Sequence, residues 1–207
     1  MSKTLYLWDL ANTLFLEKWN VELTGYLTFE DYVKATVKNP SDPRQFEEAC
    51  KIPYLQGEMY GLRLADGFKE VLSWTKNNEA FTTGVKEQMD WRAAYLNPRV
   101  GFNIMSYFKK INTTFDFVET NVKTKEMIVK YLSVKIKEGY DTVVYTDDKQ
   151  ANCQLFKEAV NKVQQEGLVL NCRFYHILNS QSTIGKRGWY FEIGNLKDLL
   201  KSEKLSL

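Results

Sequence analysis

Segments typical of buried strands alternate with segments typical of helices along most of this chain, and this alternation limits the folds it can adopt. Strands are expected at residues 5–8, 79–83, 115–120, 142–146, 172–178 and 189–193. Between them, we expect Asp66 to cap a helix over 67–76 and Thr124 to cap one over 125–137, and residues 148–165 carry apolar side chains at helical spacing. Strands that return through helices form a mainly parallel sheet, so the sequence predicts an α/β fold.

One interval breaks the alternation. Residues 17–65 lack a buried-strand pattern and contain two helical segments, 28–38 and 45–51, separated by a proline-containing stretch. A chain of 207 residues favours one domain, with or without an inserted lobe, over two equal ones. We therefore expect a small inserted helical cap at 17–65 on a core made of 1–16 and 66–207. A long crossover connection without function is the alternative.

Composition excludes several classes of function. The 28 Lys and Arg residues are interleaved with 26 Asp and Glu residues, so the charge does not form the basic stripe of a nucleic-acid-binding protein. The chain has no apolar run of the ~20 residues that a bilayer span needs, and its N-terminus lacks the pattern of a signal peptide. These features predict a cytoplasmic protein that binds neither nucleic acid nor membranes.

The cysteine and histidine content restricts the chemistry further. The three cysteines, Cys50, Cys153 and Cys172, are odd in number and lack the spacing of metal ligands, which indicates inert thiols in a reducing compartment. The chain has a single histidine, His176, in a strand-like segment, so histidine triads and zinc clusters have little to build on. An ordinary structural histidine is the preferred interpretation.

Reactive side chains stand where four of the predicted strands end. They are Asp9 after the first strand, Thr82 and Thr83 on the second, Lys123 and Lys125 after the third, and Asp147 and Asp148 after the fourth. The carboxyl ends of parallel strands share one edge of the sheet, so these groups are expected to converge. A carboxylate can attack phosphorus, a hydroxyl can hold a phosphoryl oxygen, a lysine can offset negative charge and further carboxylates can hold Mg²⁺. The set predicts phosphoryl-transfer chemistry.

The same segments resemble the four motifs of the haloacid dehalogenase (HAD) superfamily. In order along the chain they read WDLANTLF, AFTTG, NVKTKEM and VVYTDDKQAN. Each match is weak alone, but all four occur in order, and the resemblance covers most of residues 4–178. It implies a Rossmann-like three-layer sandwich with an inserted cap, and an Mg²⁺-dependent hydrolase that acts on a small phosphorylated metabolite.

The resemblance also implies a role for individual residues. Asp9 is the expected nucleophile and a Mg²⁺ ligand, and the carbonyl of Ala11 is a second ligand. Thr82 matches the hydroxyl of the second motif, with Thr83 as the alternative. Lys123 fits the motif lysine better than Lys125 because it precedes the helix cap Thr124. Asp147 matches the acidic metal ligand, supported by Asp148 and Asn152.

Ala11 departs from the family pattern. Family phosphatases carry at this position an Asp that protonates the leaving oxygen, and help of this kind is worth about 10²- to 10⁴-fold in rate. Three interpretations stay open: a phosphatase for substrates with good leaving groups or another proton source, a phosphonatase or dehalogenase, and a non-catalytic binding protein. A phosphonatase would use a cap lysine, for which the candidates are Lys34, Lys38 and Lys51, and a dehalogenase would use an arginine such as Arg44. Asn12 tolerates the left-handed backbone that the turn requires.

Overall fold

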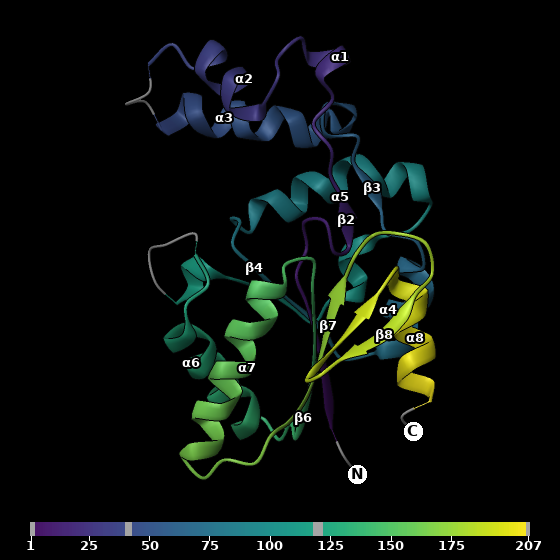
Figure 1. The fold of residues 1–207 in the computed structure, drawn as a ribbon. Coiled ribbons are helices and arrows are strands. Elements are labelled where there is room, and N and C mark those ends of the chain that lie inside the picture. Colours follow the sequence, from purple (N-terminus) through teal and green to yellow (C-terminus); the bar gives the residue numbers. More distant parts are fainter. Residues whose placement is uncertain (1–2, 40–42, 118–121, 206–207) are drawn as a thin grey trace. The chain divides into compact units, whose positions relative to one another are not determined.

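The chain forms two units in the part that the structure describes, which is residues 3–39, 43–117 and 122–205 of a computed structural model (Figure 1). The sheet unit comprises Met1–Leu14, Ala65–Gly84 and Tyr107–Leu207. The helical unit comprises Phe15–Leu64 and Val85–Ser106. Each unit is described by itself.

A seven-stranded sheet forms the centre of the sheet unit, in the order β5-β4-β1-β6-β7-β9-β8. The strands are β1 (Thr4–Trp8), β4 (Asn78–Thr82), β5 (Lys110–Thr113), β6 (Thr142–Asp147), β7 (Asn171–Ile177), β8 (Ile184–Arg187) and β9 (Tyr190–Ile193). Neighbouring strands from β5 to β9 pair in parallel, and β8 pairs antiparallel with β9 at the edge. The predicted α/β fold with a mainly parallel sheet is confirmed.

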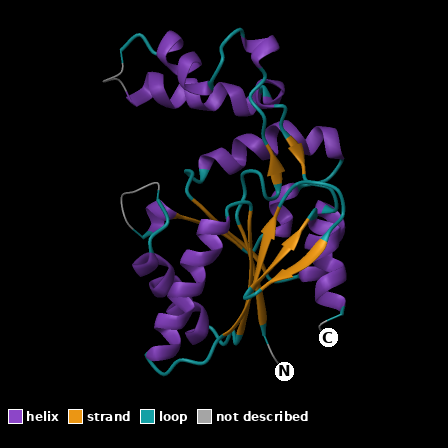
Figure 2. Ribbon diagram, viewed as in Figure 1, coloured by secondary structure: helices purple, strands orange, loops and turns teal. Residues whose placement is uncertain are grey.

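Helices cover both faces of this sheet and make the unit three-layered (Figures 1 and 2). One face carries α6 (Lys125–Lys137) and α7 (Gln150–Gln165), and the other carries α4 (Phe68–Thr75) and α8 (Leu196–Lys204). The predicted cap of α6 is confirmed, because the Thr124 side chain accepts a hydrogen bond from the backbone N–H of Met127. Asn195 caps α8 in the same way through Asp198 N–H.

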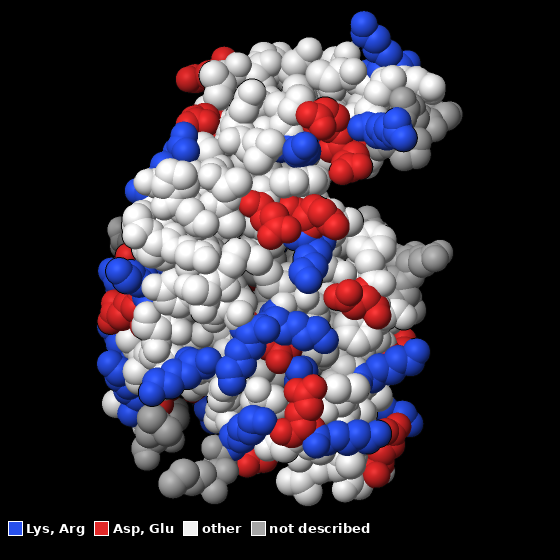
Figure 3. All heavy atoms as spheres, turned by 180° about the vertical axis from the view of Figure 1, so that it is seen from behind, with Lys and Arg blue, Asp and Glu red and all other residues white. Residues whose placement is uncertain are grey.

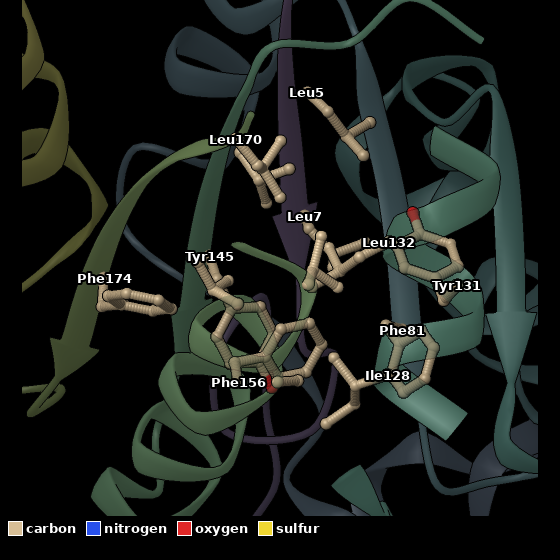
Figure 4. Close-up of a cluster of buried hydrophobic side chains, with 14 of the residues drawn as sticks. Leu5, Leu7, Phe81, Ile128, Tyr131, Leu132, Tyr145, Phe156, Leu170 and Phe174 are labelled. Atoms are coloured by element: carbon tan, nitrogen blue, oxygen red, sulfur yellow. The ribbon is translucent and has the colours of Figure 1, made fainter. Parts of the chain in front are cut away.

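The core beneath α6 and α7 is rich in aromatic rings (Figure 4). Phe156 of α7 is fully buried and lies 5.6 Å, centroid to centroid, from the edge-on ring of Phe81 on β4. It also stacks on Tyr145 of β6 with ring centroids 3.8 Å apart. Burying a side chain of this size stabilises the fold by about 1.5–3 kcal/mol. The packing holds the carboxyl end of β6 against α7.

The prediction of a strand over 115–120 is wrong. The strand in this region is β5 at Lys110–Thr113, followed by a 3-10 turn at Thr114–Asp116, while residues 118–120 lie outside the described part. Alternating aromatic residues in FDFV imitate a strand. Phe117 instead packs its ring on Phe81 and Tyr131, at centroid distances of 5.8 and 6.2 Å. Pairing with β4 selects the preceding segment.

Asp66 does not cap α4 as predicted. The N-cap is Gly67, with φ +85°, and no side chain bonds the first turn. The Asp66 carboxylate instead pairs with Lys197 at the start of α8, at 2.8 Å. A Cβ at position 67 would lie 2.7 Å from the Lys197 side chain and 3.2 Å from its backbone nitrogen, so glycine suits both the left-handed angle and the close approach.

The helical unit is built around aromatic contacts and one buried ion pair. Its elements are β2 (Phe15–Leu16), α1 (Val21–Thr24), α2 (Phe29–Thr36), α3 (Pro43–Leu55), the 3-10 helix Gly57–Tyr60, β3 (Arg63–Leu64), α5 (Glu87–Val100) and the 3-10 helix Ile104–Tyr107, which runs into the sheet unit. Arg92 donates to Glu17 at 2.6 Å and lies over the ring of Tyr54. The unit contains the helices predicted for 17–65 together with α5, which the sequence pattern did not predict.

The remaining sequence features are distributed as follows. Cys50, Cys153 and Cys172 are free thiols, and Cys153 is fully buried. Among the described residues, no helix is both long and apolar enough to cross a membrane. On the face shown in Figure 3, Lys and Arg side chains lie beside Asp and Glu side chains. This agrees with the interleaving of the two charge signs along the sequence.

Candidate active site

The turn after β1 places Asp9 at the carboxyl edge of the sheet. Its backbone N–H donates to the carbonyl of Thr146 on β6 at 2.9 Å, which ties the end of β1 to its neighbour. The chain then turns through Asn12, whose φ of +55° confirms the expected left-handed backbone. The side-chain amide of Asn179 donates to the Asn12 carbonyl. The Asp9 side chain is therefore carried by a turn anchored at both ends.

Lys123 connects this carboxylate to the end of β6. Its Nζ lies 2.7 Å from Asp9 Oδ1, 2.9 Å from Asp147 Oδ2 and 3.0 Å from the hydroxyl oxygen of Tyr145. The Lys123 side chain is 1% exposed. An ammonium group has three N–H donors, so these three contacts satisfy it completely. Two buried carboxylates and a hydroxyl thus hold a single buried cation.

Asp147 accepts hydrogen bonds at both of its oxygens. The backbone N–H of Lys149 donates to Oδ1 at 2.8 Å, and the Asn152 amide contacts Oδ1 at 3.1 Å and Oδ2 at 2.9 Å. Oδ2 also accepts from Lys123 and from the Tyr145 hydroxyl. This density of donors is what a fully buried carboxylate requires in order to stay ionised.

Three carboxylates meet at this point. Asp9, Asp147 and Asp148 each offer an oxygen, and these oxygens lie within 4.8 Å of one another. Oxygen ligands of this kind are those that Mg²⁺ prefers. The donor set therefore fits the magnesium ion that the sequence predicts.

The electrostatics of the cluster differ from one residue to the next. Burial raises the pKa of Asp9 to about 6, although Lys123 opposes the change. Burial and the neighbouring charges of Asp147 and Asp9 raise the pKa of Asp148 to about 7. Burial also acts on Asp147, but the charge of Lys123 and the surrounding hydrogen bonds outweigh it and hold the pKa of Asp147 below its usual range. Burial disfavours the charged form of Lys123, but the negative charges of Asp9 and Asp147 outweigh this effect and raise the pKa of Lys123.

The cluster opens into a cavity of about 300 Å³ within the sheet unit. Its walls include most of the residues predicted for the site: Asp9, Ala11, Thr82, Thr83, Lys123 and Asp148. Thr82 is buried at the end of β4, and its hydroxyl lies 3.4 Å from the backbone nitrogen of Gly84. Thr83 is half-buried, and its carbonyl lies 3.5 Å from the hydroxyl of Thr114. Both threonines border the same cavity as Asp9.

The two candidate lysines occupy different positions. Lys123 lies in the loop before α6 and reaches the carboxylates, whereas Lys125 is the first residue of α6 and is exposed. The preference for Lys123 depended on its place before the cap Thr124. In the structure, capping begins the helix at residue 125 and leaves Lys123 outside it.

Sequence reasoning missed three contributors. The sequence pattern places Tyr145 in a buried strand, and alternation along β6 puts it on the same face as Asp147 two residues later, which is a signal that identifies it. Lys149 borders the cavity and binds Asp147 through its backbone. His176, opposite Asp147 on β7, hydrogen-bonds the carbonyl of Asp148 at 3.1 Å through Nε2. The last contact depends on strand register, which the sequence did not provide.

Comparison with known proteins yields structural likeness at low identity. No family model and no curated protein matches the sequence. The chain is similar to a HAD family enzyme from Bacteroides thetaiotaomicron: its magnesium complex shares 14% identity over 84% of this chain and 93% of that chain, with a TM-score of 0.45. A structure of the same enzyme with magnesium and inorganic phosphate shares 15% identity over 84% and 94% of the two chains, with a TM-score of 0.46.

Proposed function

We propose that this protein is a HAD-superfamily hydrolase of the phosphatase type, which uses Mg²⁺ and acts on a small phosphorylated metabolite. The observation that carries the proposal is the contact of Lys123 with both Asp9 and Asp147. These groups lie at the carboxyl ends of β1 and β6, beside a cavity bordered by Thr82. A nucleophilic carboxylate, a buried cation and a hydroxyl then face one space. Together with Asp147, these groups come from the four separate sequence segments in which they were expected.

Asp9, Asp147, Asp148 and the Ala11 carbonyl are the proposed ligands of the ion. The fit rests on the chemistry of the donor set, three carboxylates whose oxygens lie within 4.8 Å of one another. A bound Mg²⁺ supplies positive charge that favours these carboxylates in their ionised form and offsets the charge of a phosphoryl group.

The chain's own residues account for the covalent chemistry. A carboxylate oxygen of Asp9 attacks phosphorus and forms a P–O bond, while the bond from phosphorus to the leaving oxygen breaks and that oxygen keeps the electron pair. The Thr82 hydroxyl donates a hydrogen bond to a phosphoryl oxygen, and the positive charge of Lys123 offsets the negative charge that develops on the phosphoryl group. Water then attacks phosphorus in the aspartyl-phosphate, which releases inorganic phosphate and regenerates the Asp9 carboxylate.

Ala11 shapes the choice of substrate. Ala11 borders the cavity at the position where family phosphatases carry the acid, and a methyl side chain has no proton to give to the leaving oxygen. We infer that the substrate carries a good leaving group, as an acyl or aryl phosphate does, because such an oxygen departs without being protonated. For a phosphonatase or dehalogenase role, the candidates Lys34, Lys38, Lys51 and Arg44 belong to the helical unit, as cap residues would, and nothing beyond Ala11 favours either role.

A second candidate function is non-catalytic binding of a phosphorylated ligand, which the same Ala11 favours. Turnover of p-nitrophenyl phosphate separates the two. The hydrolase proposal expects Mg²⁺-dependent turnover that EDTA and Asp9→Asn abolish, and a gain of about 10²-fold or more in the Ala11→Asp variant on an alkyl phosphate. Absence of turnover on phosphate esters, acyl phosphates, phosphonates and haloacids refutes it. Phosphate binding that persists without turnover supports the second candidate.

A further inference from the structure

We propose that Tyr145 is a positioning residue of this site, which holds Lys123 between Asp9 and Asp147 through its hydroxyl group. The inference rests on the proposed function for its catalytic consequence, but the contacts themselves do not depend on it. Lys123 donates to the Tyr145 oxygen at 3.0 Å, and the Tyr145 hydroxyl donates to Asp147 Oδ2. The hydroxyl therefore joins the two charged partners as both acceptor and donor.

The position of this hydroxyl is fixed by packing. Tyr145 is fully buried, and its ring stacks on Phe156 at 3.8 Å with an interplanar angle of 19°. Alternation along β6 directs Tyr145 and Asp147 to the same face of the sheet. A phenylalanine would preserve the ring contacts, so the hydroxyl serves the polar contacts alone.

Loss of the hydroxyl would leave one N–H of a buried ammonium without a partner. The three donors of Lys123 are taken by Asp9, Asp147 and Tyr145, and its side chain is 1% exposed, so water has little access to replace the lost contact. A buried donor without an acceptor is costly. We expect the ammonium to leave its place beside Asp9 part of the time, while the backbone and the ring packing remain.

The chain offers a matched control. Tyr131 on α6 is 2% exposed, its ring lies 5.2 Å from that of Phe81, and its hydroxyl donates to Glu79 Oε2 at 2.8 Å. Glu79 in turn pairs with the buried ammonium of Lys135 at 2.7 Å. Tyr131 is therefore also a buried tyrosine that donates to a lysine-paired carboxylate, outside the cavity. Tyr145→Phe and Tyr131→Phe remove the same group from comparable surroundings.

The first measurement needs no turnover. Each full-length variant receives a short pulse of acetic anhydride, and acetylation at Lys123 and Lys135 is measured by peptide mass spectrometry. In Tyr145→Phe, we expect Lys123 to acetylate about 10-fold faster than in the wild type, since a hydrogen bond to a charged group is worth about a factor of ten or more. In Tyr131→Phe, we expect Lys123 to be unchanged. The proposal is overturned if Lys123 acetylates at the same rate in the wild type and in Tyr145→Phe, or if its rate rises equally in both variants.

The second measurement concerns catalysis. Groups that orient the residues around a metal typically contribute about 10- to 100-fold to activity. With an aryl phosphate and Mg²⁺, Tyr145→Phe is expected to lower kcat by about 10-fold and to leave KM within about twofold, while Tyr131→Phe keeps both values. An unchanged kcat in Tyr145→Phe overturns the positioning role. A wild-type protein without any turnover refutes the proposed function instead, and the acetylation experiment still tests the contact.

Discussion

Replacing Lys123 with methionine tests how the charges of the site affect stability. The Nζ atom lies 2.7 Å from Asp9 and 2.9 Å from Asp147, so each contact is worth about 6 kcal/mol of Coulomb attraction at an effective dielectric constant of about 20. The cost of dehydrating the ammonium offsets most of this attraction. Removing one partner of a buried pair costs about 3–5 kcal/mol, and we expect a loss of that size at pH 8 without Mg²⁺.

The loss should depend on pH with a definite sign. Burial raises the folded-state pKa of Asp9 from 3.8 to about 6, so the folded protein binds this proton more tightly than the unfolded chain. The contribution of Asp9 to stability therefore falls as pH rises from about 4 to 6, by about 3 kcal/mol in the wild type. Without Lys123 to oppose it, the pKa of Asp9 rises further. The variant should thus lose much less stability at pH 5, where Asp9 carries its proton, than at pH 8.

Urea unfolding followed by circular dichroism at pH 5 and pH 8 measures the effect. Lys125→Met is the matched control because it makes the same substitution at an exposed position two residues away. It should change stability by less than about 0.5 kcal/mol at either pH. A Lys123→Met variant that loses equal free energy at both pH values, or no more than the control, would refute the electrostatic reasoning.

Three further outcomes follow from the contacts. Mg²⁺ should raise the midpoint of thermal unfolding at pH 8 by mass action, and Asp9→Asn should reduce this shift; an equal shift in both proteins would contradict the proposed ligand set. Phe156→Ala should cost about 3–5 kcal/mol in urea unfolding, because the residue is fully buried against Tyr145; a cost under about 1 kcal/mol would show that the core closes the cavity. Glu203→Leu should cost about 3 kcal/mol, because the carboxylate accepts from Arg173 and Tyr175 at 2.7 Å in a buried site; no loss would show that leucine packing compensates.

The sequence by itself determined the class of fold and where each part of the site comes from. Apolar side chains recur about every two residues in a strand and every 3.6 residues in a helix, because local backbone geometry sets these periods. Most of the strands and the Thr124 cap could therefore be predicted. Asp9 at the end of the first strand and Asp147 at the end of the fourth required only that parallel strands share an edge. For the same local reason, the segment 115–120 misled: its aromatic alternation imitates a strand.

Contacts between distant segments were decided by the tertiary structure alone. The choice of Lys110–Thr113 as β5 depends on pairing with β4, and the antiparallel edge strand β8 depends on pairing with β9. The partners of the Lys123 ammonium depend on a loop meeting two strand ends, and the part that Tyr145 plays depends on the depth at which its ring is buried. Such contacts are set by packing and by the need to pair every buried charge, and both act between segments that local sequence pattern does not connect, as between Lys123 and Asp9, which are 114 positions apart. Local sequence pattern therefore identified the position of Asp9, and tertiary packing determined which side chains lie around it.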